Sequence, residues 1–185
     1  SNPGVLKQSS YADGKVVVEG ERPVLTGGVG GHAWQAKVDT TSAGDQVMQA
    51  LPDSGNSVTS GIETGSPRID FSVLFDEPGE YYLWVRGTGT DSGSDSVHFG
   101  VDGEVQATAT SITGFSQSGV MGWSNALAAS GSPATLEIPS AGLHAISVWM
   151  AEDGFTLDKF VLTKDSAFVP SGLGPAVSLG GTLPE

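Results

Sequence analysis

Glycine and proline interrupt this sequence so often that long helices have little room to form. The chain of 185 residues contains 27 glycines and 10 prolines. They separate short runs rich in valine, isoleucine, phenylalanine and tyrosine, and no window keeps a helical apolar period over the length of an ordinary helix. Short apolar runs bounded by turn residues are typical of β-strands. The sequence therefore predicts an all-β fold with little helix.

The predicted strands show which side chains face the core. The clearest strands cover residues 15–19, 68–76, 81–87, 95–102, 134–138, 143–151 and 156–163. In the run RIDFSVLFD (68–76), every second side chain is apolar, which is typical of a strand with one buried face. The Asp-Gly pair at 102–103 favours a two-residue hairpin. Strands joined in this way predict a two-sheet antiparallel β-sandwich, with a jelly roll as the topology.

The length of the chain suits one domain. We expect a lead-in at residues 1–14, a β-sandwich module at 15–169, and a tail or linker at 170–185, where the sequence PSGLGPAVSLGGTLPE has no core pattern. Such a tail suggests a domain cut from a larger protein. No apolar run is long enough to span a bilayer and the N-terminus lacks the pattern of a signal peptide, so we expect a soluble domain.

The charge balance excludes two classes of partner. The chain has 8 basic and 21 acidic residues, a net charge of −13 at pH 7. This charge would repel the phosphates of nucleic acid and the surface of an anionic membrane. The chain also has no cysteine, so disulfides and thiolate metal sites are excluded and any metal must be bound by oxygen or histidine.

Three carboxylates near the two ends of the module predict a calcium site. Glu19 and Glu21 are two residues apart, so in an extended chain their side chains project on the same side and repel one another. Calcium binds six to eight oxygen ligands, among them carboxylates and carbonyls. If the first and last strands are neighbours, Asp158 could be a third ligand. The alternative is that both glutamates are solvated and Asp158 pairs with Lys159 or an arginine.

These motifs carry a resemblance to a known group of domains. The pairing of V-x-E-x-E near the N-terminus with G-F-x-L-D-K-F-V-L near the C-terminus resembles the β-jelly-roll carbohydrate-binding modules of families 6 and 35 and the malectin-like group. The runs HAW, MQALPD, YYLWVRG, SDSVHFGVDG and GLHAISVWMAEDGF are similar to modules of extracellular polysaccharide-degrading enzymes and to the C-terminal domain of family 115 glycoside hydrolases. The resemblance covers residues 15–163. It implies that Glu19, Glu21 and Asp158 hold a structural calcium ion.

A sugar-binding site would need exposed aromatic rings, because pyranose rings stack on them. Trp34 and Trp123 both follow glycine-rich stretches, and each could bind sugar or pack in the core. In family 6 modules, one cleft combines an early aromatic residue, a late tryptophan and an asparagine that begins the last strand. The resemblance implies the two aromatic roles for Trp34 and Trp123, but Thr156 stands in the place of the asparagine.

Polar residues beside these tryptophans could bind sugar hydroxyls. Glycine-rich loops at 26–33, 53–66, 87–95 and 111–133 are longer than hairpins require, which makes them candidate binding surfaces. They and the turn before the last strand supply His32, Asn125, Glu152 and Asp153. His32 could instead anchor its loop.

Three hypotheses for the function follow. The favoured one is a non-catalytic, monomeric, calcium-stabilised module that binds a polysaccharide or oligosaccharide outside the cell and keeps an attached catalytic module near it. The second is a structural or adhesive β-sandwich of a multi-domain surface protein. The third is a polysaccharide-cleaving enzyme, although no carboxylate pair or nucleophile elbow stands out in the sequence.

Overall fold

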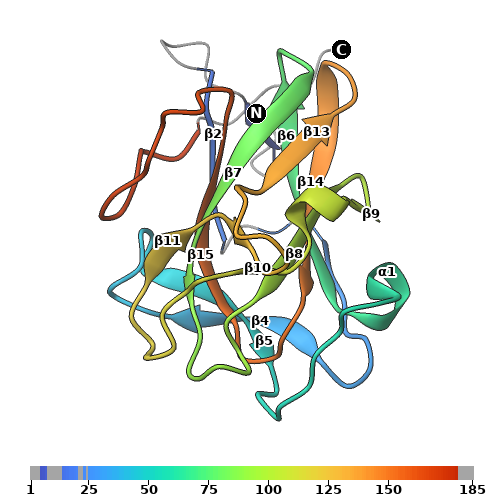
Figure 1. Cartoon of the computed structure of the whole chain (residues 1–185), viewed down its shortest axis with the longest axis vertical. Helices are drawn as coiled ribbons and strands as arrows, with labels where there is room; N and C mark the ends of the chain where they lie inside the picture. Colours follow the sequence, from blue (N-terminus) through green and yellow to red (C-terminus); the bar gives the residue numbers. More distant parts are fainter. Residues whose placement is uncertain (1–4, 8–13, 21–22, 24, 179–185) are drawn as a thin grey trace.

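The computed structural model describes residues 5–7, 14–20, 23 and 25–178. Within these residues the chain forms two packed β-sheets, which we name sheet A and sheet B (Figure 1). The predicted all-β jelly-roll sandwich is confirmed. The helices among the described residues are one α-helical turn, α1 (Ile62–Gly65), and one 3-10 turn, Ala107–Ala109. No helix in this part of the chain has the length and apolar character that a membrane span needs.

Sheet A has eight strands, in the order β1-β6-β14-β8-β10-β12, with β3 also beside β6 and β9 also beside β8. Its pairings are antiparallel except that β1 runs parallel to β6. The bounds of its strands are β1 (Val5–Lys7), β3 (Leu25–Thr26), β6 (Arg68–Phe75), β8 (Val97–Val101), β9 (Glu104–Val105), β10 (Ile112–Thr113), β12 (Ala126–Leu127) and β14 (Gly142–Met150).

Sheet B has seven strands, in the order β11-β7-β15-β5-β4, with β13 also beside β7 and β2 also beside β15. All of its pairings are antiparallel. The bounds of its strands are β2 (Val16–Glu19), β4 (Ala33–Val38), β5 (Gln46–Leu51), β7 (Gly79–Thr88), β11 (Gly122–Ser124), β13 (Thr135–Ile138) and β15 (Thr156–Thr163).

The core lies between the inner faces of the two sheets. The alternating apolar residues of β6 and β8 are buried as the sequence predicts, and they meet the apolar residues of β15 from the opposite sheet. The ring of Phe160 packs edge to face against Phe71 and Phe99, with centroid distances of 5.4 and 5.2 Å. Burying one such side chain contributes about 1.5–3 kcal/mol, so these contacts hold the two sheets together.

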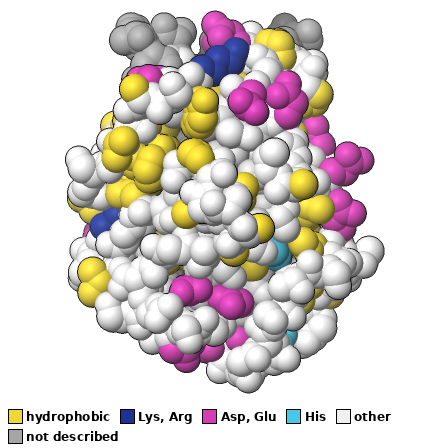
Figure 2. All heavy atoms as spheres, viewed as in Figure 1, with side chains coloured by type: hydrophobic (Ala, Val, Ile, Leu, Met, Phe, Trp, Pro, Cys, Tyr) yellow, Lys and Arg dark blue, Asp and Glu magenta, His cyan; other side chains and the backbone are white. Residues whose placement is uncertain are grey.

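Turn residues follow the sequence prediction at the hairpin between β8 and β9. Asp102 and Gly103 both have positive φ angles, 54° and 80°, as a two-residue hairpin of this type requires. The β6–β7 turn, by contrast, connects the two sheets, because β6 belongs to sheet A and β7 to sheet B. The long loops that join the sheets gather with β4 and β5 at the lower end of the molecule (Figure 1). Figure 2 shows acidic side chains on the surface near this end.

Candidate functional site

A β-bulge in β15 places two charged residues side by side on the outer face of sheet B. The pairing of β15 with β7 shifts register between Leu157 and Lys159. Before the shift Leu157 points into the core, and after it Phe160 does so. One extra residue in a strand changes which positions face inward. Asp158 and Lys159 therefore both project from the outer face, although strict alternation would put one of them inside.

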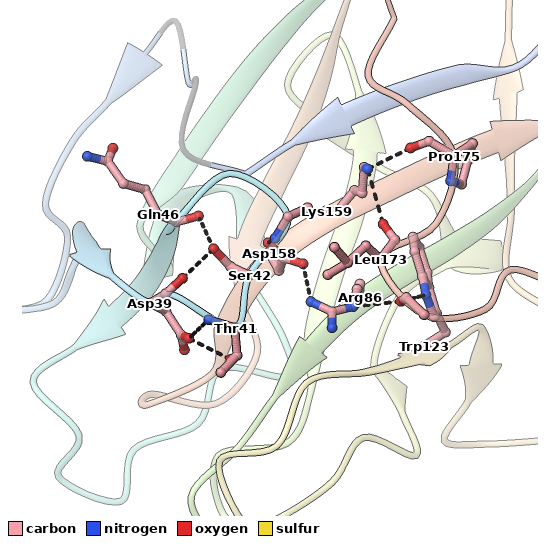
Figure 3. A network of polar contacts seen from close by, with 12 residues as sticks. Asp39, Thr41, Ser42, Gln46, Arg86, Trp123, Asp158, Lys159, Leu173 and Pro175 are labelled. Carbon is pink, nitrogen blue, oxygen red and sulfur yellow. Dashed lines mark hydrogen bonds and ion pairs between the residues drawn. The ribbon is translucent and has the colours of Figure 1, made fainter.

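Asp158 is the centre of a buried polar network on this face (Figure 3). Its Oδ2 forms an ion pair with Arg86 Nη1 at 2.5 Å, and its Oδ1 accepts a hydrogen bond from the backbone N–H of Ala43 at 3.0 Å. The side chain of Asp158 is completely buried and that of Arg86 is 9% exposed. The pair is therefore shielded from water, and each charge compensates the other.

The C-terminal segment 171–178 lies across the same face. Trp123 Nε1 and Arg86 Nε donate to the carbonyl oxygen of Gly172 at 3.0 and 3.1 Å. Lys159 Nζ donates to the carbonyl oxygens of Leu173 and Pro175 at 3.2 and 2.6 Å (Figure 3). The segment thus covers the charged residues and supplies their hydrogen-bond acceptors.

The segment ends beside the first strand of sheet B. Val17 N–H donates to Ser178 Oγ, and Ser178 N–H donates to the carbonyl oxygen of Val17, both at 2.9 Å. Residues 179–185 lie outside the described residues. The tail boundary that the sequence suggests at 170 stays a prediction, but residues 171–178 are part of the packed domain.

Trp123 stands at the edge of sheet B and is partly exposed. It lies in β11 opposite Arg86 of β7, so its ring projects on the outer face. Gly174, with a φ of 73°, packs against the ring so closely that a Cβ atom there would clash with the Cζ2 atom of Trp123. Together with the hydrogen bond from Nε1 to Gly172, this contact fixes the orientation of the indole. Part of an aromatic ring is therefore presented in a defined direction.

At the loop end of the sandwich, Asp153 anchors the loop that follows β5. Its carboxylate is fully buried and accepts hydrogen bonds from the N–H groups of Ser54, Gly55 and Asn56, at 2.9 to 3.1 Å. The Ser54 hydroxyl and His32 Nε2 also contact it, both at 2.9 Å. Burial raises the pKa of Asp153, but the hydrogen bonds from Ser54, Asn56 and His32 outweigh burial and lower that pKa to about 2.

Four of the predicted sugar-binding residues have buried side chains. Trp34 is 4% exposed, belongs to the core, and donates from Nε1 to the carbonyl oxygen of Pro67 at 3.1 Å. His32, Asp153 and Thr156 are 9%, 0% and 5% exposed. Stacking needs an exposed ring, so Trp34 fits the core-packing alternative. His32 fits the loop-anchoring alternative, because its ring is held by Asp153.

Glu152, Asn125 and Trp123 remain partly exposed. Glu152 lies at the loop end, where its Oε2 accepts a hydrogen bond from the N–H of Asp95 at 2.9 Å. Asp95 in turn accepts a hydrogen bond from Gln117 Nε2 at 2.7 Å. These contacts tie together the loops that precede β8, β11 and β15. The sugar-binding roles of the three partly exposed residues stay predictions.

The expected meeting of the first and last strands is confirmed, because β2 pairs with β15 and Glu19 stands opposite Lys159. Gly20 N–H also donates to the carbonyl oxygen of Asp158 at 2.7 Å. The calcium prediction itself is untested, since Glu21 lies outside the described residues. The side chain of Asp158 does not fit the role of a ligand in this arrangement, because both of its oxygens have protein partners and one partner is a guanidinium. Among the described residues no three acidic or histidine side chains are grouped to hold a metal ion.

Two serine-histidine-aspartate groups resemble catalytic triads in composition only. In the first, Ser54 and Asp153 both contact Nε2 of His32. The histidine of a catalytic triad bonds the aspartate through one ring nitrogen and the serine through the other, so this group is not arranged as a triad. In the second, His144 Nδ1 lies 2.6 Å from Asp102 Oδ2 and its Nε2 lies 3.2 Å from Ser140 Oγ. That Nε2 is closer, at 2.9 Å, to the carbonyl oxygen of Ser140, which requires a proton on the nitrogen. A protonated Nε2 cannot act as the base for the serine hydroxyl.

The fold is similar to that of carbohydrate-binding modules of known structure. A family 35 carbohydrate-binding module from Clostridium thermocellum matches with a TM-score of 0.53 and 14% identity, covering 80% of this chain and 96% of the module. A carbohydrate-binding module from the lichenase 5A of Cellvibrio mixtus, solved in complex with cellotriose, matches with a TM-score of 0.51 and 14% identity, covering 81% and 97%. The GH26-CBM35 β-(1,4)-mannanase of Podospora anserina matches with a TM-score of 0.54 and 16% identity, covering 86% of this chain and 29% of the enzyme.

Sequence comparison gives the family. An uncharacterized protein, P23, from Formosa agariphila is 33% identical in an alignment of 124 positions. The alignment covers 63% of this chain and 30% of that protein's length. The family model of the glycosyl hydrolase family 115 C-terminal domain matches residues 11–177, which include every strand of the two sheets except β1 and all but the last residue of the segment 171–178. The chain therefore belongs to the glycosyl hydrolase family 115 C-terminal domain family.

Proposed function

We propose that this domain is a non-catalytic carbohydrate-binding module that binds a polysaccharide through the partly exposed ring of Trp123. The observation that carries the proposal is the fixed orientation of this ring, which Gly172 holds by a hydrogen bond and Gly174 by close packing. An aromatic ring that is already ordered loses little entropy when a sugar stacks on it. The likeness of the fold to carbohydrate-binding modules supports the same function.

Polar groups near the ring would select the hydroxyls of the sugar. Asn125 follows Trp123 by two residues and is partly exposed. Exposed residues of the loop before β11, among them Gln117 and Ser118, are further candidates. Glu152 lies in the turn before β15 and is linked to Gln117 through Asp95, whose N–H donates to Glu152 and whose carboxylate accepts a hydrogen bond from Gln117. We place the sugar at the edge of sheet B, where these loops adjoin β11.

Affinity electrophoresis against a panel of plant and algal polysaccharides tests this proposal. We expect at least one polysaccharide to retard the domain, and Trp123→Ala to abolish the retardation. Trp123→Phe is the matched control, because it keeps an aromatic face and should keep part of the affinity. Circular dichroism must show that both variants are folded. Unchanged retardation of Trp123→Ala would contradict the site.

The two alternative functions are outcomes of the same experiments. A structural or adhesive module would show no retardation on any polysaccharide, although it would still fold. A cleaving enzyme would release reducing ends from a polysaccharide when the isolated domain is incubated with it. We expect retardation without the release of reducing ends.

We further propose that the domain acts outside the cell, as a monomer, attached to a catalytic module. The domain spans 30% of the length of its relative from Formosa agariphila, and its structural neighbours include enzymes of which it covers less than a third. A module that binds the substrate raises the local substrate concentration for an attached enzyme. Size-exclusion chromatography tests the monomer. Removal of the module from a full-length parent enzyme should slow the cleavage of insoluble polysaccharide more than that of soluble oligosaccharides.

Calcium is a separate proposal, and it rests on Glu19 and Glu21. In an extended chain their spacing would put both carboxylates on one side, and Gly20 between them is held against β15 by its hydrogen bond to the carbonyl oxygen of Asp158. If calcium binds there, a chelator lowers the melting temperature, and the double variant Glu19→Gln, Glu21→Gln melts at the same temperature with and without the chelator. Equal melting of the wild type under both conditions would remove calcium from the proposal.

A further inference from the structure

The strand β7 presents two further aromatic side chains, Tyr82 and Trp84, on the outer face of sheet B. Their neighbours along the strand are completely buried in the core: Tyr81, Leu83 and Val85. Because side chains alternate between the two faces of a strand, Tyr82, Trp84 and Arg86 project together from the outer face. Tyr82 and Trp84 are both partly exposed. The face that carries Trp123 therefore offers more than one aromatic ring to the solvent.

Trp84 and Trp123 are close neighbours on this face. Trp123 stands directly opposite Arg86 in the pairing of β11 with β7, and Trp84 comes two residues before Arg86. Diagonal neighbours of this kind on adjacent antiparallel strands lie about 7–8 Å apart. Tyr82 comes two residues before Trp84, so the distance along β7 from Tyr82 to the level of Trp123 is roughly 13 Å. We name Tyr82, Trp84 and Trp123 the aromatic stripe, and it is longer than one sugar ring.

Polar groups along the aromatic stripe are not used by the protein. Nε1 of Trp84 and Oη of Tyr82 form no hydrogen bond with the described residues, and neither atom is buried. The side-chain amide of Asn125 has no partner in this part of the chain either. Asn125 directly follows Ser124, which stands opposite Val85, so it adjoins Trp84. An indole N–H, a phenol and an amide are thus available to the hydroxyls of a sugar.

The C-terminal segment 171–178 borders the aromatic stripe. Its carbonyl oxygens accept hydrogen bonds from Trp123 and Arg86 at one end of the stripe and from Lys159 on the neighbouring strand β15 (Figure 3). The segment covers these two cations, while all three rings of the stripe stay partly exposed. The rings are therefore an accessible part of this face, and the segment forms one side of the surface that they make.

The exposed charges at the far end of the stripe are acidic. Glu80 and Glu137 stand directly opposite one another in the pairing of β7 with β13, just beyond Tyr82, and both are exposed. Arg86 and Lys159, in contrast, are only 7% and 3% exposed. Exposed carboxylates repel the carboxylate or sulfate groups of an acidic polysaccharide. The stripe therefore favours a neutral sugar chain.

We infer that a neutral polysaccharide chain lies along β7, with successive sugar residues on Trp123, Trp84 and Tyr82. The inference rests on the proposed function and deepens it, because Trp123 then binds one ring of the chain while Trp84 and Tyr82 bind the rings that follow. Rings linked in one chain lose their translational freedom only once when they bind, whereas separate rings lose it each time. Affinity should therefore rise with the length of the oligosaccharide.

The indole N–H groups report on this arrangement one residue at a time. The chain has four tryptophans, so a nitrogen-15 correlation spectrum shows four indole resonances, and Trp84→Phe and Trp123→Phe assign two of them. We expect xylohexaose, cellohexaose, mannohexaose or galactohexaose, added singly, to shift both resonances with one dissociation constant. Trp34 and Trp149, which are 4% and 0% exposed, are the internal controls and should not shift. The corresponding monosaccharide should bind at least tenfold more weakly.

Side-chain variants test the two new contacts. Trp84→Ala and Tyr82→Ala should each weaken the binding of the hexasaccharide roughly tenfold, because each removes one stacked ring. Trp84→Phe keeps an aromatic face and should keep most of the affinity, which separates stacking from a folding defect. Phe168→Ala is the matched control, since Phe168 is another partly exposed aromatic residue, and its ring contacts Lys15 outside the stripe. This control should bind as the wild type does.

The failure of this inference is distinguishable from the failure of the proposed function. A hexasaccharide that shifts the Trp123 resonance alone, and binds Trp84→Ala and Tyr82→Ala with full affinity, overturns the inference and leaves the proposed function standing. Tighter binding of an oligogalacturonate than of every neutral hexasaccharide overturns the neutral ligand. Loss of binding in Trp84→Ala but not in Trp123→Ala would support the contact with Trp84 and contradict the role of Trp123. If no saccharide binds at all, both proposals are overturned.

Discussion

The guanidinium of Arg86 and the carboxylate of Asp158 form an ion pair across β7 and β15, with Nη1 and Oδ2 2.5 Å apart. The register shift between Leu157 and Lys159 makes this pair possible, because it puts Asp158 on the outer face with Arg86. The segment 171–178 then closes over the pair and accepts a second hydrogen bond from Arg86 at Gly172. The pair therefore links the last strand of sheet B to the C-terminal segment.

Removing one member of this pair should destabilise the domain strongly. Arg86→Ala leaves the Asp158 carboxylate buried without its cation, and breaking a buried pair in this way costs about 3–5 kcal/mol. The double variant Arg86→Ala, Asp158→Ala should lose less stability than the sum of the two single variants. Urea denaturation of the four proteins measures the coupling. Additive losses would show that the two side chains do not stabilise one another.

Gly174 should not tolerate a side chain. Gly174→Ala adds a Cβ atom that clashes with the ring of Trp123, at a backbone φ of 73° that L-residues rarely adopt. We expect a loss of about 1–3 kcal/mol and a displaced C-terminal segment. Tryptophan fluorescence should move to longer wavelength as Trp123 gains contact with water. Gly172→Ala is the matched control, since a Cβ atom there meets nothing within 4 Å although its φ of 55° is also positive. Equal effects of the two substitutions would mean that backbone strain alone explains the loss.

Protonation of Asp153 should make the domain less stable in acid. Its pKa is about 2 in the folded protein, below the usual aspartate value of 3.8, so Asp153 contributes stability above pH 3.8 that is lost as the pH falls toward 2. The depressed pKa corresponds to about 2 kcal/mol. Chemical denaturation of the wild type and Asp153→Asn at several pH values between 5 and 2 measures this. The difference in stability between the two should shrink over that range, and a constant difference would contradict the lowered pKa.

His98 should produce a second loss of stability at milder pH. Burial lowers the pKa of His98 below the usual histidine value of 6.5, against the opposing effect of the hydrogen bond to Val58. Its Nε2 donates to the carbonyl oxygen of Val58 at 2.7 Å, and its Nδ1 accepts the N–H of Ser111 at 2.8 Å, so the ring is neutral. The folded state binds its proton less readily than the unfolded state, and stability should fall as the pH drops below 6.5. Urea denaturation at several pH values between 8 and 5 tests this. The His98→Gln variant should lose less stability over this range than the wild type, because glutamine does not titrate.

Alanine variants of Trp34 and Trp123 should have different effects on stability and on polysaccharide binding. Trp34→Ala removes a side chain that is 4% exposed and should cost about 3–5 kcal/mol of stability, as other large core truncations do. Trp123→Ala removes a partly exposed ring and should cost less stability but abolish polysaccharide binding. Thermal unfolding and affinity electrophoresis of both variants check this. A folded Trp34→Ala variant that loses binding at unchanged stability would contradict the core role of Trp34.

The sequence predicts the β-sandwich well because the alternation of apolar and polar residues along a strand shows which side chains are buried. Ile69, Phe71 and Val73 repeat with a period of two, and all of them are buried. The same rule fails at Asp158 and Lys159, where strict alternation leaves a charge on the core face. The signal of the bulge is nevertheless present, since Phe155 and Leu157 are apolar at odd positions while Phe160 and Leu162 are apolar at even positions.

The candidate site was harder to predict because it depends on contacts between distant segments. Nothing local to Trp34 distinguishes a core tryptophan from a loop tryptophan; its burial follows from packing between the sheets and from its hydrogen bond to Pro67. Asp153 likewise looks like an exposed turn residue, and it is buried because three successive N–H groups of another loop surround its carboxylate. Arg86 and its partner Gly172 in the segment 171–178 lie 86 positions apart in the chain, so local patterns do not reveal their contact.

The two hydrogen bonds between Val17 and Ser178 join the C-terminal segment to β2, and β2 contacts the earlier strand β1, so the two ends of the described chain lie close together. A unit whose ends lie side by side can be accommodated within a surface loop of a host protein without forcing that loop apart. The same fold could therefore be transplanted into the middle of another enzyme as well as joined to its terminus.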